Sequence, residues 1–377
     1  MGHPEHHYPT IHVGGTNGKG STCAFLVAAL RSLGLKVGLY TSPHLVSVLE
    51  RVQVNGTPMS EDAFAEWTTL LQPHIDRGNA SFFEAMTAIG FADLAARGVD
   101  IAVIEVGLGG RLDSTNVITP LTSVVTKIAL EHTDYLGADL SGIAREKAGI
   151  AKPNVPFVTG EQDPVVRRVL QEAADQRGAG PIVLVDTGRP APQPVRLGLK
   201  GPHQVANAWV ALAALRTLPA RFGSWDDDRF PDAFVEAHLP GRFDVRGRWI
   251  FDVAHNPDGV AVLADALAEY RPRRPVHALV GIRNDKEWRP MLERLLPQVD
   301  RLVLTVAPTV PADQRWVQVD LAGWTTERVI GQPVVFEPDF AAALEQVQEG
   351  AETILVTGSF HTVGDAMARL PGFAPAG

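Results

Sequence analysis

The sequence predicts an α/β protein built on mostly parallel sheets, and three observations lead to this prediction. Short apolar runs with the character of strands alternate with helical patterns along the chain, which is typical of a parallel sheet covered by helices. A glycine-rich turn at residues 14–21 joins the first such run to the first helix. After a polar segment at 223–232 the alternation begins again. We therefore expect a phosphate-loop (P-loop) domain followed by a smaller Rossmann-like α/β domain.

The first element, IHVGGTNGKGSTCAFLVAALRSLG from residue 11, predicts a strand, a glycine-rich turn and a helix. Glycines let consecutive backbone N–H groups turn toward one point, the helix adds the positive end of its dipole, and Lys19 supplies a full charge. The loop is a variant, because Val13 stands where the first glycine of the common pattern belongs and Gly20 separates Lys19 from Ser21. An ordinary strand-to-helix turn is the alternative, but the flanking strand and helix favour a nucleotide phosphate site.

The remaining elements follow in order. Expected strands of the first domain cover 10–15, 36–41, 100–107, 122–128, 155–160 and 182–186, and its clearest helices cover 24–34, 84–98 and 206–218. The stretch 188–202 is rich in proline and glycine, which predicts an irregular or antiparallel excursion. Strands of the second domain are expected at 248–257, 276–282, 301–307 and 353–360. We place the boundary ahead of Pro240, which gives domains of residues 1–239 and 240–377.

Composition excludes several classes of protein. A chain of 377 residues with 45% hydrophobic content can bury two sizeable cores. A net charge of −9 argues against nucleic acid as a partner, because DNA- and RNA-binding faces show clustered Lys and Arg. No apolar run approaches the roughly 20 residues that span a bilayer, and the first residues do not resemble a signal peptide. The single cysteine, Cys23, is expected to be a small buried residue. We expect a cytoplasmic protein with no membrane partner.

Further strings become informative together, in this order along the chain: TSPHL (41–45), FFE (82–84), EVGLGGRLDSTN (105–116), EHTDYLG (131–137), REKAGI (145–150), HQVANAW (203–209), GRFD (241–244), DVAHNP (252–257) and GSFHTVGD (358–365). With the loop GTNGKGS, they closely resemble the folylpolyglutamate synthase and dihydrofolate synthase family, the folate branch of the Mur ligase superfamily. The resemblance covers nearly the whole chain and implies a Mur ligase-like fold.

The resemblance also implies an activity in folate biosynthesis and one-carbon metabolism. ATP would phosphorylate a carboxylate of a folate, and the amine of L-glutamate would attack the acyl phosphate to give an amide, ADP and phosphate. Dihydropteroate would be a possible second acceptor. The ATP-binding residues implied in the loop are Asn17, Gly18, Lys19, Gly20 and Ser21, with Lys19 also catalytic, because a fixed cation neutralises charge that grows during phosphoryl transfer.

Magnesium is the implied metal, as two ions, and the family ligands map to Ser42, Glu105 and His132. Oxygen ligands suit a hard cation, and because histidine is less usual for magnesium, His132 is assigned to a second ion. From the residues alone, Glu105 could instead be a capping or salt-bridged carboxylate, His132 a core or loop histidine, and Ser42 the start of a turn.

Lys147 resembles the family lysine that is carbamylated, and the resemblance makes it a catalytic residue. A carbamate attracts magnesium where an ammonium group repels it. The alternative is a charge on the surface of a helix, paired with Glu146 or Glu131.

The resemblance assigns the remaining sites to both domains. Asn207, Arg242 and Asp252 correspond to positions that contact ATP, and Arg242 offers a planar donor fork to phosphate. His255 is a candidate for the glutamate pocket. The pterin pocket is implied to be lined by Phe82, Phe83, Glu84, Leu112 and Asp113, although adjacent phenylalanines at a helix start are also typical of a core.

Two other functions stay open at this point. One is a Mur-type ligase that acts on a cell-wall precursor, and the other is a nucleotide-binding regulator without turnover. Relatives usually carry a longer segment before the first strand, and in them that segment contacts dihydropteroate, so polyglutamate synthase activity is the firmer expectation. We expect a monomer.

Overall fold

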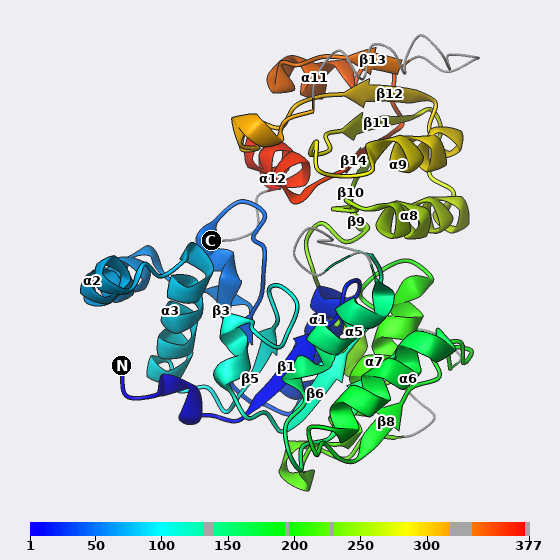
Figure 1. The fold of residues 1–377 in the computed structure, drawn as a ribbon. Helices are drawn as coiled ribbons and strands as arrows, with labels where there is room; N and C mark the ends of the chain where they lie inside the picture. The colour runs from blue at the N-terminus through cyan, green and yellow to red at the C-terminus, as the bar shows by residue number, and fades with distance from the viewer. Residues whose placement is uncertain (131–136, 138, 193–195, 227–229, 317–333, 374–377) are drawn as a thin grey trace. The chain divides into compact units, whose positions relative to one another are not determined.

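The computed structural model describes residues 1–130, 137, 139–192, 196–226, 230–316 and 334–373. These residues form two compact units. The first contains the described residues of 1–198 and 204–238, and the second contains those of 199–203 and 239–373. Each unit is an α/β layer structure around a mostly parallel sheet (Figure 1), which confirms the predicted fold class. The domain limits at 239 and 240 stay a prediction.

The sheet of the first unit has eight strands in the order β4-β3-β2-β5-β1-β6-β7-β8. They are β1 (Thr10–Gly14), β2 (Val37–Tyr40), β3 (Val52–Val54), β4 (Thr57–Pro58), β5 (Ile101–Glu105), β6 (Thr122–Val125), β7 (Phe157–Thr159) and β8 (Ile182–Leu184). All neighbours are parallel except β3, which pairs antiparallel with β2 and β4. The central strands β1 and β5 are buried along their whole length, as continuous apolar strands of a doubly covered sheet should be.

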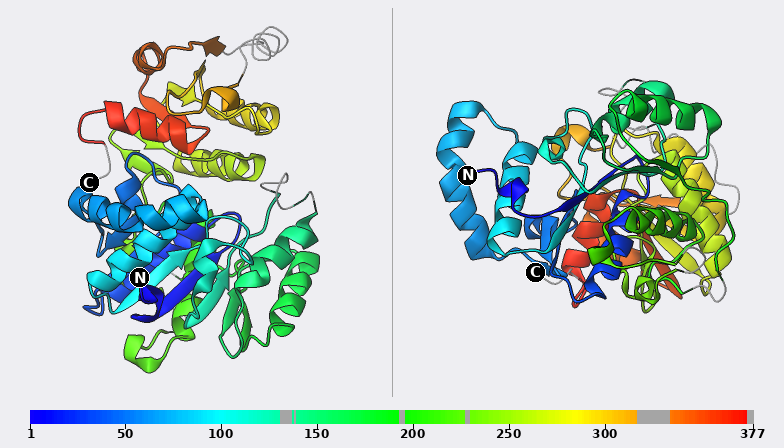
Figure 2. Two further views of the ribbon diagram at one scale, coloured as in Figure 1. Left: turned by 60° about the vertical axis from the view of Figure 1, so that its left-hand side comes forward. Right: turned by 90° about the horizontal axis from the view of Figure 1, so that it is seen from below.

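The helices of the first unit are α1 (Lys19–Arg31), α2 (Glu61–Gly78), α3 (Phe82–Ala96), α5 (Leu140–Lys147), α6 (Pro164–Asp175) and α7 (His203–Arg216). The views of Figure 2 show α2 lying beside α3, where both pack on a core that includes Tyr40 and Leu94. A second core joins α5 and α6 to β6 and β7 through Val125 and Phe157. The two short strands β3 and β4 and the helix α2 were not expected from the sequence. Of the stretch 188–202, the described residues 188–192 and 196–202 form no strand and are irregular.

The second unit has a six-stranded sheet in the order β13-β12-β11-β14-β10-β9. The strands are β9 (Asp244–Arg246), β10 (Trp249–Phe251), β11 (Val276–Val280), β12 (Arg301–Leu304), β13 (Val334–Phe336) and β14 (Thr353–Thr357). Among these described strands, β9 alone is antiparallel to its neighbour. Helices α8 (Pro257–Tyr270) and α9 (Trp288–Leu295) cover one face, and α11 (Phe340–Gln346) and α12 (Phe360–Arg369) cover the other (Figure 1).

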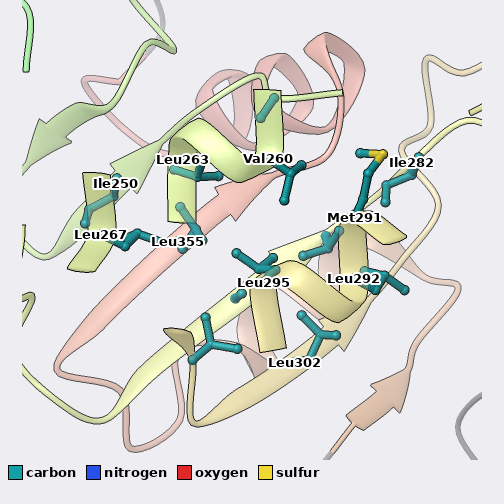
Figure 3. Packing of buried hydrophobic residues seen from close by; sticks show 14 of the residues in the cluster. Ile250, Val260, Leu263, Leu267, Ile282, Met291, Leu292, Leu295, Leu302 and Leu355 are labelled. Atoms are coloured by element: carbon teal, nitrogen blue, oxygen red, sulfur yellow. The ribbon is translucent and has the colours of Figure 1, made fainter. Parts of the chain in front are cut away.

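The core of the second unit lies between its sheet and the helices α8 and α9. Leu263 and Leu267 of α8 and Leu292 and Leu295 of α9 point toward Leu355 and the other strand residues (Figure 3). These leucines recur at the three- and four-residue spacing that puts side chains on one helix face. The packed face fixes the strand ends that carry the candidate residues of this unit.

Candidate functional site

The loop after β1 has a backbone that only glycine can form. Gly15 has φ of +132°, and a Cβ there would lie 1.9 Å from Thr126 Oγ1. Gly18 has φ of +93° and is the N-cap of α1. It lies so close to Asn207 that a Cβ would be 2.4 Å from Asn207 Oδ1. The loop therefore brings its backbone close to neighbouring groups at the helix N-terminus, where N–H groups and the helix dipole favour an anion.

The end of β6 holds this loop in place. The backbone N–H groups of Thr16 and Asn17 both donate to Lys127 O, at 2.8 and 3.3 Å. The Thr126 hydroxyl donates to Asn17 O at 2.9 Å and also contacts Gly14 O at 3.2 Å. The loop shape is therefore set by a strand more than 100 residues away in sequence.

Two lysines converge on the loop. Lys19 Nζ donates to Gly15 O and Thr16 O, each at 3.0 Å. Lys147 Nζ, from the end of α5, donates to the same Gly15 O at 2.9 Å. Lys147 is only 3% exposed, so it is not the surface charge that was its alternative interpretation. Two ammonium groups around one carbonyl create a strongly positive locus that an anion would stabilise.

Glu105 lies beside the loop at the end of β5. It pairs with Val13 of β1 in the sheet, and the residue is 4% exposed. The Thr41 hydroxyl donates a hydrogen bond to Glu105 Oε2, which ties the carboxylate to the segment that carries Ser42. Burial raises the pKa of the Cys23 thiol, and the charge of Glu105 raises it further. Cys23 is buried, as the sequence predicted.

His132 lies outside the described residues, so its proposed role as a metal ligand rests on the sequence alone. Ser42 is partly exposed in the loop after β2. Next to it, His44 Nδ1 accepts a hydrogen bond from Arg51 Nε at 2.9 Å. Burial lowers the pKa of Arg51, while Tyr40 and Glu105 oppose that effect.

The residues predicted to line a pterin pocket have different surroundings. Phe82 and Leu112 are 59% and 80% exposed, and the Arg51 guanidinium lies 5.2 Å from the Phe82 ring centroid. Phe83 instead packs on the core around Tyr40 and against the backbone of Gly107. Glu84 is the N3 residue of a capping box at the start of α3: its Oε2 accepts from Ser81 N at 2.7 Å. These bonds lower the pKa of Glu84.

Asp113 is held by the loop that follows Glu105. Its Oδ2 accepts from the N–H groups of Gly107 and Leu108, at 3.1 and 2.8 Å, and its Oδ1 accepts from the backbone and the hydroxyl of Thr115. The Thr115 hydroxyl also contacts His12 Nε2 at 2.8 Å. Because both carboxylate oxygens are engaged, Asp113 in this structure shapes the loop.

A polar chain links α7 to the phosphate loop. Gln204 Nε2 donates to Ser21 Oγ at 3.2 Å, and Asn207 Nδ2 donates to Gln204 Oε1 at 3.0 Å. Gln204 has no exposed surface and Ser21 is buried. The N-cap of α1 is Gly18, so Ser21 does not cap the helix.

In the second unit, Arg242 and His255 lie near Phe360. The Arg242 guanidinium is 5.2 Å from the Phe360 ring centroid, and the His255 ring is 5.7 Å from it. Asp252 accepts from Phe243 N at 2.8 Å and from Ala254 N at 2.9 Å. Burial raises the pKa of Asp252, and the positive charge of Arg242 partly offsets the rise.

Sequence reasoning missed Thr41, Thr126 and Gln204, which position the named residues. Thr126 lies within the predicted strand 122–128, and Thr41 and Gln204 lie inside motifs that were singled out for their neighbours. Polar residues at the carboxyl ends of parallel strands are the signal that could have found the two threonines. Gln204 on an apolar helix carries no such signal.

Comparisons with known proteins place this geometry in context. The family model described as "Mur ligase, glutamate ligase domain" matches residues 241–360. The dihydrofolate synthase/folylpolyglutamate synthase of Bacillus subtilis is 31% identical over 98% of this chain and 92% of its own length.

Two solved structures have similar folds. The Escherichia coli FolC structure with DHPP and ADP has a TM-score of 0.82 and 32% identity, over 96% of this chain and 88% of its own. A bifunctional folylpolyglutamate synthase/dihydrofolate synthase with Mn, AMPPNP and L-glutamate bound has a TM-score of 0.77 and 32% identity, over 96% and 89%. No helix among the described residues is long and apolar enough to cross a membrane.

Proposed function

Because the chain belongs to the folylpolyglutamate synthase and dihydrofolate synthase family of Mur-type ligases, we propose that it is an ATP-dependent ligase that joins L-glutamate to the carboxylate of a folate. Dihydropteroate is the proposed second acceptor. The observation that carries the proposal is the convergence of Lys19 and Lys147 on Gly15 O beside the buried Glu105. Cations and a carboxylate around a helix N-terminus suit a nucleotide with its divalent metal.

The residues of the loop would bind and orient the nucleotide. Backbone N–H groups from Gly18 to Gly20 would donate to the β- and γ-phosphates, with Asn17 holding the loop through its bond to Lys127 O. Lys19 would leave its carbonyl partners to neutralise charge on the transferred phosphoryl group. The space at Gly15 and Gly18, which a Cβ would fill, supports this assignment.

Magnesium would supply charge neutralisation and a template for the phosphates when bound. Glu105 and Ser42 offer the oxygen ligands, with the Thr41 hydroxyl holding the carboxylate. We assign His132 to a second ion from the sequence. Manganese bound with AMPPNP in a related structure supports a divalent metal in general.

Carbamylation of Lys147 is the proposed source of a further anion. As an ammonium group, Lys147 adds a second positive charge beside Lys19, which opposes a metal ion. The ammonium group would first lose one proton, and formation of an N–C bond between the neutral amine and carbon dioxide, with loss of a second proton, would leave a carbamate with one negative charge. Its buried amine next to the loop supports the assignment.

The second unit would contribute Arg242 and Asp252 to the nucleotide and His255 to glutamate. The exposed faces of Phe82 and Leu112 offer an apolar surface to a flat heterocycle. Phe83, Glu84 and Asp113 would act by shaping that region, because their side chains are engaged elsewhere. A monomeric state and a cytoplasmic location remain predictions from the sequence.

The reaction is tested with an acceptor whose carboxylate carries ¹⁸O in both oxygens. One oxygen of the carboxylate would form the bond to the γ-phosphorus, and attack by the glutamate amine would break the bond between that oxygen and carbon. We expect one ¹⁸O in each released phosphate and a product heavier by one glutamyl residue. Unlabelled phosphate with a glutamylated product would overturn the acyl phosphate, and absence of any product would overturn the ligase.

The two other functions predict different results. A nucleotide-binding regulator would release no phosphate in the presence of glutamate and a pteridine carboxylate. A cell-wall ligase would need a nucleotide-sugar substrate. Neither has a specific observation in its favour here.

A further inference from the structure

Gln204 is a fully buried amide between two residues assigned to the nucleotide. It lies in the first turn of α7, in the chain segment that follows the irregular stretch 188–202. Its amide nitrogen contacts the Ser21 hydroxyl, and its oxygen contacts the Asn207 carboxamide. Because Gln204 has no exposed surface, it acts through these neighbours and touches no ligand itself.

The hydrogen bonds run in one direction along this chain. Asn207 donates with Nδ2, so Gln204 Oε1 is the acceptor and its NH₂ group faces Ser21. A serine hydroxyl has a single proton. Since Ser21 Oγ accepts from Gln204, its proton is directed to another acceptor, and Ser21 lies two residues after Lys19 in the turn that faces the phosphate site.

The same chain orients Asn207. With Nδ2 engaged by Gln204, Asn207 Oδ1 faces Gly18, where it lies within 2.4 Å of the position a Cβ would take. The amide thus closes a ring of contacts through Ser21, Gln204, Asn207 and Gly18. The N-terminal turn of α1 is held from outside its own helix.

We propose that Gln204 is a positioning residue for nucleotide binding, which sets Ser21 as a hydrogen-bond donor toward the phosphates and fixes Asn207 against Gly18. This inference rests on the proposed function, since it needs a nucleotide at the loop. A purely structural amide would affect folding without affecting nucleotide affinity. The two roles therefore separate by experiment.

The test uses Gln204→Met, which removes both hydrogen bonds, and Gln204→Glu, which keeps the acceptor for Asn207 but cannot donate to Ser21. The same two substitutions at Gln72, exposed on α2 with its amide bonded to Asp76, are matched controls. For each full-length variant, the dissociation constant of ADP with magnesium is measured by calorimetry, and KM is measured separately for ATP and glutamate. Melting temperatures without nucleotide report folding.

We expect both Gln204 variants to bind ADP about five- to tenfold more weakly, as the loss of an oriented hydrogen bond predicts. KM for ATP should rise by a similar factor and KM for glutamate should stay within about twofold. Combining Gln204→Met with Ser21→Ala should weaken binding less than the product of the single effects, because the two residues act through one bond.

Several outcomes would overturn the inference. ADP affinity equal to that of the wild type in Gln204→Glu, or multiplicative effects of Gln204→Met and Ser21→Ala, would show that Gln204 does not act through Ser21. Weaker folding with unchanged affinity would make the role structural. If the wild-type chain itself binds no ADP, the proposed function fails first, which keeps the two failures distinct.

Discussion

Three charged side chains lie at or beside the glycine-rich loop. Lys19 and Lys147 place two positive charges on one carbonyl, and Glu105 places a buried carboxylate at the next strand end. A buried charge is costly unless other charges or hydrogen bonds compensate it. These residues are therefore the positions where a small change should alter turnover more than stability.

Glu105→Gln should lower kcat by at least about 100-fold, because it keeps the shape of the side chain but removes the charge expected to hold a divalent cation. The melting temperature should change by only a few degrees. ADP formation in the presence of ATP, glutamate and a reduced folate is the measurement. Glu172→Gln, on the exposed surface of α6, serves as the control, and unchanged turnover in Glu105→Gln would remove the metal role.

Lys147→Ala should also lose most activity, and added acetate or formate should restore part of it if a carbamate is the working form. A small carboxylate can occupy the space of the truncated side chain and supply the missing negative charge. Turnover is measured across a range of acetate concentrations, with Lys36→Ala, an exposed lysine, as control. Loss of activity without any rescue would favour an ammonium group at this position.

Strand ends and the loops after them hold most of the candidate site residues of the first unit. The loop after β1 depends on Thr126 and Lys127 at the end of β6, and the loop after β5 depends on Asp113 and its bonds to Gly107 and Leu108. Parallel strands bring these distant segments together at one sheet edge. Substitutions that keep each strand but disturb its loop should separate folding from binding.

Gly15→Ala should abolish ATP turnover, because the added Cβ would displace Thr126 from the loop. Gly34→Ala is the matched control: Gly34 also has a positive φ, +79°, but a Cβ there meets nothing within 4 Å. Both variants should lose about 1 kcal/mol of stability from the backbone conformation. KM and kcat for ATP distinguish them, and equal activities would show that the loop tolerates a side chain.

The buried His12 in β1 should make the free energy of unfolding depend on pH. Burial lowers the pKa of His12 to about 3, below its ordinary value near 6.5. Between those values the unfolded chain binds the proton and the folded chain does not, so stability falls as the pH drops below about 6.5. At pH 5 the loss from this one group should be about 2 kcal/mol.

Urea unfolding of the wild type and of His12→Gln at pH 7 and pH 5 measures this effect. The variant should lose less stability on acidification than the wild type, and the difference should be close to the stated loss. His203, whose pKa burial lowers to about 4, acts with the same sign in both proteins and cancels. An equal loss in both would assign the acid sensitivity to other groups.

At the scale of the whole molecule, the sequence predicted the fold class and most strands, because continuous apolar runs and a glycine-rich loop depend on local composition. The short strands β3 and β4 lack a long apolar run, so they were not expected. The surroundings of Glu84 and Asp113 were not predicted either, although SFFE at 81–84 has the spacing of a capping box. Both carboxylates bind nearby backbone N–H groups, and a motif names a residue without saying which partner it binds.

The local sequence also did not predict that Lys147 and Gln204 are buried. Each lies on a helix whose sequence would also suit an exposed position or an apolar core, and each finds its partner more than 100 residues away along the chain. Contacts of that separation arise from the strand order. They follow from the fold as a whole and not from the local pattern.

The decisive measurement of ligase activity is phosphate release from ATP in the presence of magnesium and glutamate. The acceptor is a reduced folate in one reaction and dihydropteroate in another. Omission of glutamate or of the acceptor provides the blanks. We predict release that needs both glutamate and a pteridine carboxylate, and turnover on both acceptors would mark a bifunctional enzyme. Phosphate release in the absence of glutamate or of the acceptor, or no release with either acceptor, would contradict this prediction.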